Sequence, residues 1–458
     1  MARDRGHWSS RAGFVLAASG SAIGLGNLWK FPYITWENQG GAFVLVYLLC
    51  ILVVGLPIMI AEILIGRMTQ KSPVGALREA VGPAWGFVGG LGVFTGFVIL
   101  GYYAVIAGWS LRSFVLCLGW SFNGYTEGAA AEGFGPFLGQ GFAQIGLAGL
   151  FLLVTVFVVR RGIAGGIERV ARTLMPVLFA ILIILLGRAL FLDGSGEALK
   201  FIFAPRFGEL KAEGILEALG HSFFTLSLGM GAMITYGSYL HKDQSVVSAS
   251  WIVVVLDTLI AIVATVIMFA VIFSVPGMRE EIGKSTAGML FLTLPELFYT
   301  KITFGAVLAP LFYILVAFAA LTSTISLLEV AASYFIDQRK MSRGSAVALC
   351  GGATFVLSIL CGLSLGAVDG LSTFELWAGK AGVLTTLDHL ASNWLLPFGG
   401  FFLTLAVGWF MSQEDKRREL RHAPSWFRFE IWRFFMRWVA PVAVGAILVA
   451  VIMGKDFS

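Results

Sequence analysis

Residues 20–27 read GSAIGLGN, in the middle of a long apolar stretch that begins near residue 11. A second stretch, TLSLGMGA at residues 225–232, lies inside another apolar run. Each glycine in a helix interior costs about 1 kcal/mol relative to alanine, and both stretches place hydroxyl or amide side chains where hydrocarbon would surround them. Either stretch alone would also fit close helix packing through small residues. Together they predict two membrane-spanning helices that are interrupted halfway.

The rest of the chain has the composition of a membrane protein. Of its 458 residues, 58% are hydrophobic and 13% are charged, which is too little charge for the surface of a soluble domain. The apolar runs are about 20 residues long, as a spanning helix requires, and lack the alternation of barrel strands. We therefore predict an all-α polytopic membrane protein without a cleavable signal peptide. The sequence predicts eleven spans: 11–37, 41–66, 86–120, 141–159, 168–192, 214–240, 248–275, 303–337, 345–367, 386–411 and 427–453.

The two interruptions fall in the first and the sixth predicted span. Because five is an odd number of spans, the second group of five would be inverted relative to the first. Inverted repeats with interrupted helices are typical of secondary transporters, which bind their substrate where the interruptions meet. The expected organisation is a first repeat over residues 1–200, a second repeat over residues 201–411, and an additional eleventh span within residues 412–458.

Basic residues predict the orientation in the membrane. Lys and Arg gather in loops after even-numbered spans, such as Arg160 and Arg161, whereas none lies between Ser113 and Val159. Such positive loops stay in the cytoplasm. We expect a multi-pass protein of the plasma (inner) membrane, with the N-terminus in the cytoplasm and the C-terminus outside. The net charge of +5 comes from these loops, so no nucleic-acid partner is expected.

Polar residues inside other spans indicate a cation site. Thr322, Ser323 and Ser326 share one helical face, and hydroxyl oxygens suit sodium; alternatively, these hydroxyls bond to their own helix. Asp257 is the one acid in the apolar run 251–273. A carboxylate at that depth is costly and is functional by default. We therefore expect Asp257 to serve an ion site or a proton relay.

Three long motifs carry a resemblance to a known family: HWSSRAGFVLAASGSAIGLGNLWKFPY at 7–33, FFTLSLGMGAMITYGSYLHKDQ at 223–244 and ALTSTIS at 320–326. With them the chain resembles the neurotransmitter:sodium symporter family, in the branch of bacterial leucine and multi-hydrophobic amino-acid transporters. The resemblance covers the first ten spans and implies the leucine-transporter-type fold of five plus five inverted spans. It departs at the end, where the family's usual twelfth span is not predicted. It implies sodium-coupled symport of neutral, hydrophobic L-amino acids by alternating access, with Na+ as the coupled ion.

The resemblance also implies two sodium sites. The first would consist of Ala22, Asn27, Thr225 and Asp257, with the substrate carboxylate as a further ligand. The second would join spans 1 and 8 and consist of Gly20, Ile23, Ala319, Thr322 and Ser323. Because the substrate would complete the first site, substrate and sodium would each strengthen the binding of the other.

The substrate pocket implied by the resemblance lies between the interruptions. It would consist of Ala22, Leu25, Gly26, Ile99, Tyr103, Phe224, Thr225, Ser227, Met230, Ser323 and Leu327. Backbone N–H groups of residues 25 and 26 and the Tyr103 hydroxyl would bind the carboxylate, and the apolar side chains would surround a hydrophobic substrate side chain. Family members that carry monoamines have an aspartate where this chain has Gly24, so an amino acid is expected instead of an amine.

Gates on both sides of the pocket carry over from the family in the same way. The outer gate would consist of Tyr103 and Phe224 over the substrate, with Lys30 above them paired to Asp388 or, alternatively, to Glu375. The inner gate would consist of an ion pair between Arg5 and Asp337, with Trp8, Ser238 and Tyr239 beside it.

Asp257 departs from the asparagine that is common in the family, whose chloride-dependent members balance charge with a bound anion nearby. A carboxylate at this position would supply the negative charge itself, so transport is expected to be independent of chloride. Tyr47, which resembles a chloride ligand, is retained, whereas His221 stands where glutamine is usual.

Other functions are less well supported by the sequence. A proton-coupled or uncoupled amino-acid carrier of the same architecture would lack the Thr322–Ser323 pair, and a non-transporting amino-acid sensor would need an output domain. An enzyme is not expected, because the five histidines are scattered without the spacing of a metal-binding motif. The expected partners are the amino-acid substrate, sodium ions and the lipid bilayer, without an obligatory protein partner.

Overall fold

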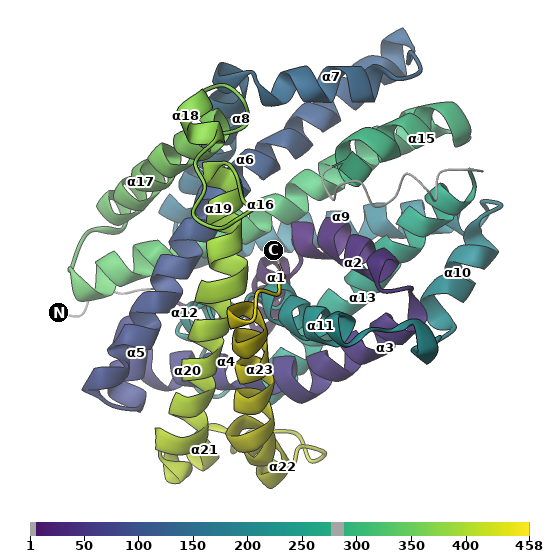
Figure 1. The fold of residues 1–458 in the computed structure, drawn as a ribbon. Helices are drawn as coiled ribbons and strands as arrows, with labels where there is room; N and C mark the ends of the chain where they lie inside the picture. The colour runs from purple at the N-terminus through teal and green to yellow at the C-terminus, as the bar shows by residue number, and fades with distance from the viewer. Residues whose placement is uncertain (1–5, 276–287, 458) are drawn as a thin grey trace.

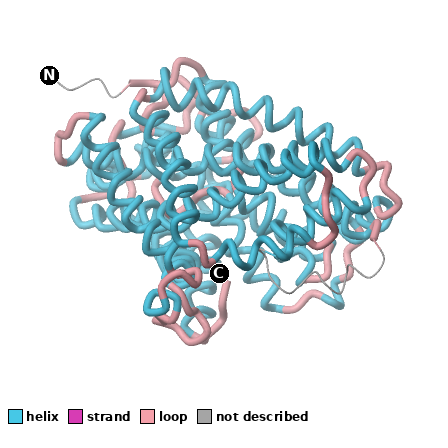
Figure 2. Tube along the Cα trace, turned by 90° about the horizontal axis from the view of Figure 1, so that it is seen from above, coloured by secondary structure: helices cyan, strands magenta, loops and turns pink. Residues whose placement is uncertain are grey.

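The computed structural model describes residues 6–275 and 288–457, and within those ranges it contains helices and no strand (Figure 2). The first predicted span is divided into α1 (Arg11–Ala22), a wide π-helical turn η1 (Gly26–Lys30) and α2 (Phe31–Glu37), with a bend of 51° between its halves. The sixth is divided into α11 (Ala212–Thr225) and α12 (Ala232–Gly237). Both interruptions lie in the glycine-rich stretches, so the structure confirms the predicted positions of the two breaks.

Nine further stretches of the described chain are long and apolar enough to cross a membrane. They are α3 (Gly41–Cys50) with η2 (Ile51–Gly55) and α4 (Leu56–Thr69); η3 (Pro83–Trp85) with α6 (Gly86–Asn123); α8 (Gly141–Arg160); η4 (Ile163–Glu168) with α9 (Arg169–Ala189); α13 (Val246–Phe273); α16 (Gly305–Gln338); α17 (Arg343–Leu363); α19 (Val383–His389) with η8 (Leu390–Leu395), α20 (Leu396–Leu405) and η9 (Ala406–Phe410); and α22 (Phe429–Phe434) with η10 (Phe435–Val439) and α23 (Ala440–Ile452). The bent first span brings this number to ten. Since α11 and α12 are each too short to qualify, the count of eleven stays a prediction.

Short helices connect the spans at both ends of the bundle. They are α5 (Pro73–Ala80), α7 (Ala129–Leu138), α10 (Ser195–Phe203), η5 (Phe207–Glu209), η7 (Met289–Thr293), α15 (Leu294–Lys301), α18 (Asp369–Ser372) and α21 (Gln413–Glu419). The interrupted spans lie in the interior of the bundle: α1 packs against α9, α13 and α16, and α12 packs against α4. The long helices α6 and α16 pack along each other beside them (Figure 1).

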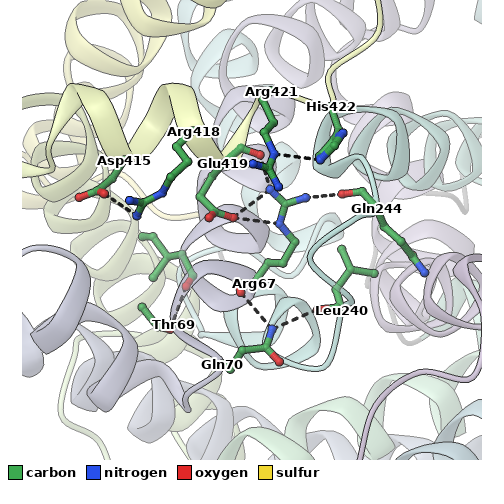
Figure 3. Close-up of polar contacts among 11 residues, drawn as sticks. Arg67, Thr69, Gln70, Leu240, Gln244, Asp415, Arg418, Glu419, Arg421 and His422 are labelled. Carbon is green, nitrogen blue, oxygen red and sulfur yellow. Dashed lines mark hydrogen bonds and ion pairs between the residues drawn. The ribbon is translucent and has the colours of Figure 1, made fainter.

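A polar cluster joins distant parts of the chain at one end of the bundle (Figure 3). Arg67, at the end of α4, is 1% exposed and forms an ion pair with Glu419 of α21, with 2.9 Å between Nη2 and Oε2. The Arg67 guanidinium also donates to the backbone carbonyl of Gln244. Beside it, the Gln70 amide donates to the carbonyl of Leu240 over 3.0 Å. The loop before the last span is therefore fastened to the second span and to the turn that follows α12.

Candidate functional site

The two interruptions meet at a cavity in the interior of the bundle. Its lining includes every predicted substrate residue except Leu25, which lines a neighbouring cavity instead. The Ser227 hydroxyl donates to the Ser21 carbonyl over 2.9 Å and joins one interruption to the other. Three lining residues were not among the predicted substrate residues: Ser21, Gly24 and Ser326. The helical spacing of Ser323 and Ser326 was the signal that could have added Ser326.

The interruption of the sixth span depends on unusual backbone conformations. Ser227, Gly229 and Gly231 have φ angles of 53°, 77° and 74°, a left-handed region that glycine enters without steric cost. The backbone N–H of Gly229 donates to Oε1 of the buried Glu62 over 2.8 Å. A β-carbon on Gly229 would lie 2.8 Å from the carbonyl oxygen of Leu396. This close approach to α20 leaves no space for a larger residue.

Side chains hold the interruption of the first span. Asn27 Oδ1 accepts from the Gly24 N–H over 3.0 Å, and the Tyr103 hydroxyl accepts from the Leu25 N–H over 3.0 Å. Gly24 lies tightly against the cavity, because a β-carbon there would be 2.7 Å from Ser323 Oγ and 2.9 Å from the Tyr103 hydroxyl. Any side chain at position 24 would therefore enter the cavity.

The residues predicted for the first sodium site form a buried oxygen-rich cluster beside the cavity. Asn27, Thr225 and Asp257 are each at most 1% exposed. The Asn27 amide nitrogen donates to Asp257 Oδ1 over 2.8 Å and to Thr225 Oγ1 over 3.0 Å. The Thr225 hydroxyl lies 3.1 Å from both Asp257 carboxylate oxygens. Ala22 lines the adjoining cavity, so three separate spans bring the four predicted ligands to one place.

The residues predicted for the second sodium site meet where α1 and α16 touch. Ser323 Oγ lies 3.5 Å from the Ile23 carbonyl oxygen and 3.3 Å from the Ala319 carbonyl oxygen, longer than the usual 2.7–2.8 Å of a hydroxyl bond. Thr322 Oγ1 donates to the Ala319 carbonyl over 2.9 Å. A β-carbon on Gly20 would lie 3.1 Å from the Thr322 β-carbon. The polar atoms that meet here are therefore hydroxyl and carbonyl oxygens, the ligands that an alkali cation prefers.

The outer gate is only partly arranged as predicted. Tyr103 and Phe224 line both the substrate cavity and a second cavity, which we call the outer cavity after its predicted side, and so lie between the two. Lys30 and Asp388 both line the outer cavity, but the described residues show no ion pair between them. Lys30 Nζ instead donates to the Phe457 carbonyl over 2.8 Å. The alternative partner, Glu375, accepts from the backbone N–H of Gly379 in its own loop.

The inner gate is described except for Arg5, which lies outside the described residues. Trp8 is fully buried, and its indole N–H donates to the Tyr236 carbonyl over 2.9 Å. Its backbone N–H donates to the Tyr239 carbonyl over 3.2 Å, so Trp8 and Tyr239 are neighbours as predicted. Ser238, in the same turn, donates its hydroxyl to the Thr235 carbonyl over 2.7 Å.

Two acids lie near this inner end. Asp337 accepts from the Ser72 N–H over 2.6 Å. Sequence reasoning missed Glu329, a fully buried acid that accepts from the Tyr239 hydroxyl over 2.6 Å and pairs with Arg343. Its spacing of seven residues from Thr322 places both on one face of α16, which was the available signal.

The region that resembles a chloride site is buried and largely aromatic. His221 is 3% exposed, and its ring stacks on Phe31 with 5.5 Å between the centroids. The Tyr47 ring lies 5.7 Å from the His221 ring. Neither ring nitrogen of His221 has a hydrogen-bond partner among the described residues. Elsewhere in those residues, no group of three or more His, Cys, Asp or Glu side chains could hold a metal ion.

Apolar spans and two interruptions that meet at one cavity with polar and apolar sides define a secondary transporter of the membrane. The chain belongs to the sodium:neurotransmitter symporter family, whose profile matches residues 5–128 and 138–456. Members of this family are transporters and not enzymes.

Individual relatives agree with the family assignment. An uncharacterised sodium-dependent transporter of Bacillus subtilis is 34% identical over 440 residues, which cover 95% of each chain. The sodium-dependent neutral amino acid transporter B(0)AT2 of Bos taurus is 30% identical over 297 residues, which cover 58% of this chain and 40% of that one. A crystal structure of MhsT in complex with L-phenylalanine matches with a TM-score of 0.87 at 37% identity, over 97% of this chain and 99% of that one.

Proposed function

We propose that the chain carries neutral, hydrophobic L-amino acids together with Na+ across the plasma membrane by alternating access, independently of chloride. The observation that carries this proposal is the meeting of two backbone interruptions at one cavity, with buried oxygen ligands on one side and apolar side chains on another. The repeats at 1–200 and 201–411 would move against each other, and residues 412–458 would lie outside them. The N-terminus would be cytoplasmic and the C-terminus outside.

The Asn27 amide offers a route by which sodium and substrate could be coupled. Asn27 now turns its nitrogen toward Asp257 and its oxygen toward the Gly24 N–H. To coordinate Na+ together with Asp257 and Thr225, the amide must turn its oxygen toward them, because only oxygen is an acceptor. That rotation would free the Gly24 N–H, which could then donate a hydrogen bond to a substrate carboxylate in the cavity. Sodium bound first would thereby prepare the anionic end of the substrate site.

The other end of the cavity favours an apolar substrate side chain. Ile99, Phe224, Met230 and Leu327 line it without an acid or base among them. Methionine adapts to ligands of several shapes, so aromatic and aliphatic substrates are both expected. The MhsT structure with bound L-phenylalanine supports an aromatic amino acid as the first candidate. Gly24 packs so tightly against Ser323 and Tyr103 that position 24 has no space for an acidic side chain. The cavity therefore lacks the acid that selects amines in other members of the family.

Uptake into proteoliposomes tests the proposal. A panel of radiolabelled amino acids is offered with and without an inward sodium gradient, and we expect sodium-driven uptake of hydrophobic amino acids, L-phenylalanine included. Uptake that ignores sodium and follows a pH gradient would instead favour a proton-coupled carrier. Binding of an amino acid without any accumulation would favour a sensor.

Two variants on α16 test the second sodium site. Thr322→Val removes the hydroxyl that faces the Ala319 carbonyl and keeps the side-chain shape, and we expect the sodium concentration for half-maximal uptake to rise at least about ten-fold, or about 1.4 kcal/mol. Thr324→Val is the matched control, because the Thr324 hydroxyl bonds to Thr155 over 2.9 Å on a different face. Equal sodium dependence in the two variants would contradict the assignment of Thr322.

Chloride independence has a separate test. Asp257 lies against Asn27 and Thr225, and an ionised carboxylate there would supply the negative charge that a bound anion supplies in chloride-dependent members of the family. Replacing chloride with gluconate should leave uptake by the unchanged protein intact. In Asp257→Asn, which keeps the shape and removes the charge, remaining uptake should become stimulated by chloride. Loss of uptake by the unchanged protein in gluconate would refute this part of the proposal.

A further inference from the structure

The last described residues of the chain lie at the outer gate. After α23 ends, Gly454 takes a left-handed conformation with φ of 86°, and its N–H donates to the Val451 carbonyl over 2.9 Å. Glycine in this conformation commonly ends a helix and turns the chain. Figure 1 shows the end of the chain beside α11 and α19. We call residues 455–457 the terminal segment.

A buried asparagine holds the terminal segment. Asn393 of η8 is fully buried, and both ends of its amide contact the segment. Its Nδ2 donates to Asp456 Oδ1 over 2.9 Å, and its Oδ1 accepts from the Phe457 N–H over 2.7 Å. Asp456 also forms an ion pair with Lys380 and lies 3.3 Å from His389 Nδ1. Interior side chains of the tenth span are thus arranged to bind the segment.

The segment in turn binds the cation of the outer gate. Lys30 Nζ donates to the Phe457 carbonyl over 2.8 Å and lies 5.5 Å from the centre of the Phe224 ring. Asp388 lines the same outer cavity as Lys30, yet the two do not pair. Phe457 also lines a neighbouring cavity together with Lys30 and Phe224. Among the described residues, Lys30 is therefore held by the terminal segment and not by the acid across the cavity.

We propose that the terminal segment is a latch that positions Lys30 and competes with Asp388 for it. While the latch is bound, the outer cavity stays open to substrate. Its release frees Lys30 to pair with Asp388 and close the cavity over Tyr103 and Phe224. Asp456 and Asn393 are positioning residues in this scheme. The inference rests on the proposed transport function, since a gate has a role only if the substrate passes it.

A reversible cross-link tests the latch in the full chain. A β-carbon on Gly220 of α11 would lie 4.0 Å from the Phe457 β-carbon, within the 3.5–4.5 Å that a disulfide needs. The double variant Gly220→Cys/Phe457→Cys can therefore fix the latch in its bound position. The four native cysteines are buried and free, so they should not compete for the new pair.

The oxidised and reduced forms of this variant should differ in transport and agree in binding. We expect oxidation to lower sodium-driven uptake of L-phenylalanine at least about ten-fold, with recovery on addition of dithiothreitol. Equilibrium binding of L-phenylalanine in sodium should change less than about two-fold. Equal uptake in both forms, with the cross-link verified by mass, overturns the latch. Absence of uptake in the unchanged protein as well would overturn the transport function and the latch with it.

A charge variant gives an independent measurement. Ile106 lines the outer cavity. The rate at which a cysteine in Ile106→Cys reacts with a water-soluble thiol reagent therefore reports how accessible the outer cavity is. Added to this reporter, Asp456→Asn removes the charge that Lys380 holds, and we expect the reaction to slow at least about three-fold as the outer cavity closes more often. Lys455→Gln is the matched control, because the Lys455–Glu213 pair is half exposed and contributes little. The same rate in both variants overturns the proposal.

Discussion

The interruption of the first span and that of the sixth span face the same cavity, but different forces keep them open. In the first, residues 23–25 have no left-handed conformation, and the side chains of Asn27 and Tyr103 accept from its backbone. In the sixth, residues 226–231 include three left-handed residues, two of them glycine. The comparison indicates that the first interruption is adjustable by rotating side chains, whereas the sixth is fixed by backbone conformation.

The largest expected effect comes from a substitution at Gly229. Gly229→Ala imposes the left-handed penalty of about 1–2 kcal/mol and adds a β-carbon 2.8 Å from the Leu396 carbonyl oxygen. We expect a lower unfolding temperature in detergent and loss of measurable L-phenylalanine binding. Gly90→Ala is the control, because a β-carbon there meets nothing within 4 Å. Normal binding by Gly229→Ala would show that the sixth interruption is not fixed by its backbone.

A smaller effect is expected when the acceptor for the sixth interruption is removed. Glu62→Ala leaves the buried Gly229 N–H without a partner, at a cost of about 1–3 kcal/mol. Glu62→Gln keeps an acceptor at the same place and should retain most of the stability. The free energy of unfolding of the two variants in detergent measures the difference. If the glutamine variant is destabilised as much as the alanine variant, the charge of Glu62 matters and the hydrogen bond does not.

The first interruption should respond more mildly and at a different step. Tyr103→Phe removes the acceptor of the Leu25 N–H, and the hydrogen bond contributes roughly 1 kcal/mol. We expect about a five-fold loss of affinity for L-phenylalanine with nearly unchanged thermal stability, measured by scintillation proximity and by thermal unfolding. A loss of stability as large as that of Glu62→Ala would remove the distinction between the two interruptions.

The smallest effect is expected at Ser227, which belongs to both interruptions through its bond to the Ser21 carbonyl. Ser227→Gly relieves the left-handed conformation but loses this bond, and the two effects of about 1 kcal/mol each should nearly cancel. Ser227→Ala loses the bond and keeps the strain, so it should unfold at a lower temperature. Thermal unfolding of the two variants separates the effect of the hydrogen bond from that of the backbone strain. If Ser227→Ala is more stable than Ser227→Gly, position 227 is not strained.

Much of this arrangement could be predicted from local sequence. Apolar runs set the spans because a helix satisfies its own backbone in lipid, and the glycines at 24, 26, 229 and 231 marked both interruptions. The resemblance to the family predicted that Asn27, Thr225 and Asp257 lie together, and in the structure these three side chains are hydrogen-bonded to one another. The partner of Lys30 could not be predicted, because it is a backbone carbonyl 427 residues away, and any residue supplies a carbonyl. Likewise, the pairing of Glu329 with Arg343 depends on how α16 and α17 lie against each other, and neither residue belongs to a motif.

The contact between Arg67 and Glu419 has a consequence for how the protein is made. The two residues are 352 positions apart, so at about 5–20 residues per second a ribosome needs roughly 20 to 70 s to add the second after the first. During that interval the Arg67 guanidinium lacks the Glu419 carboxylate, and its charge stays hydrated if the side chain extends to the aqueous surface. Arg67 can therefore take its buried, paired position only after α21 has emerged. A ribosome stalled before residue 413 would therefore keep the Arg67 guanidinium at the aqueous surface, because burying this cation without Glu419 costs about 3–5 kcal/mol.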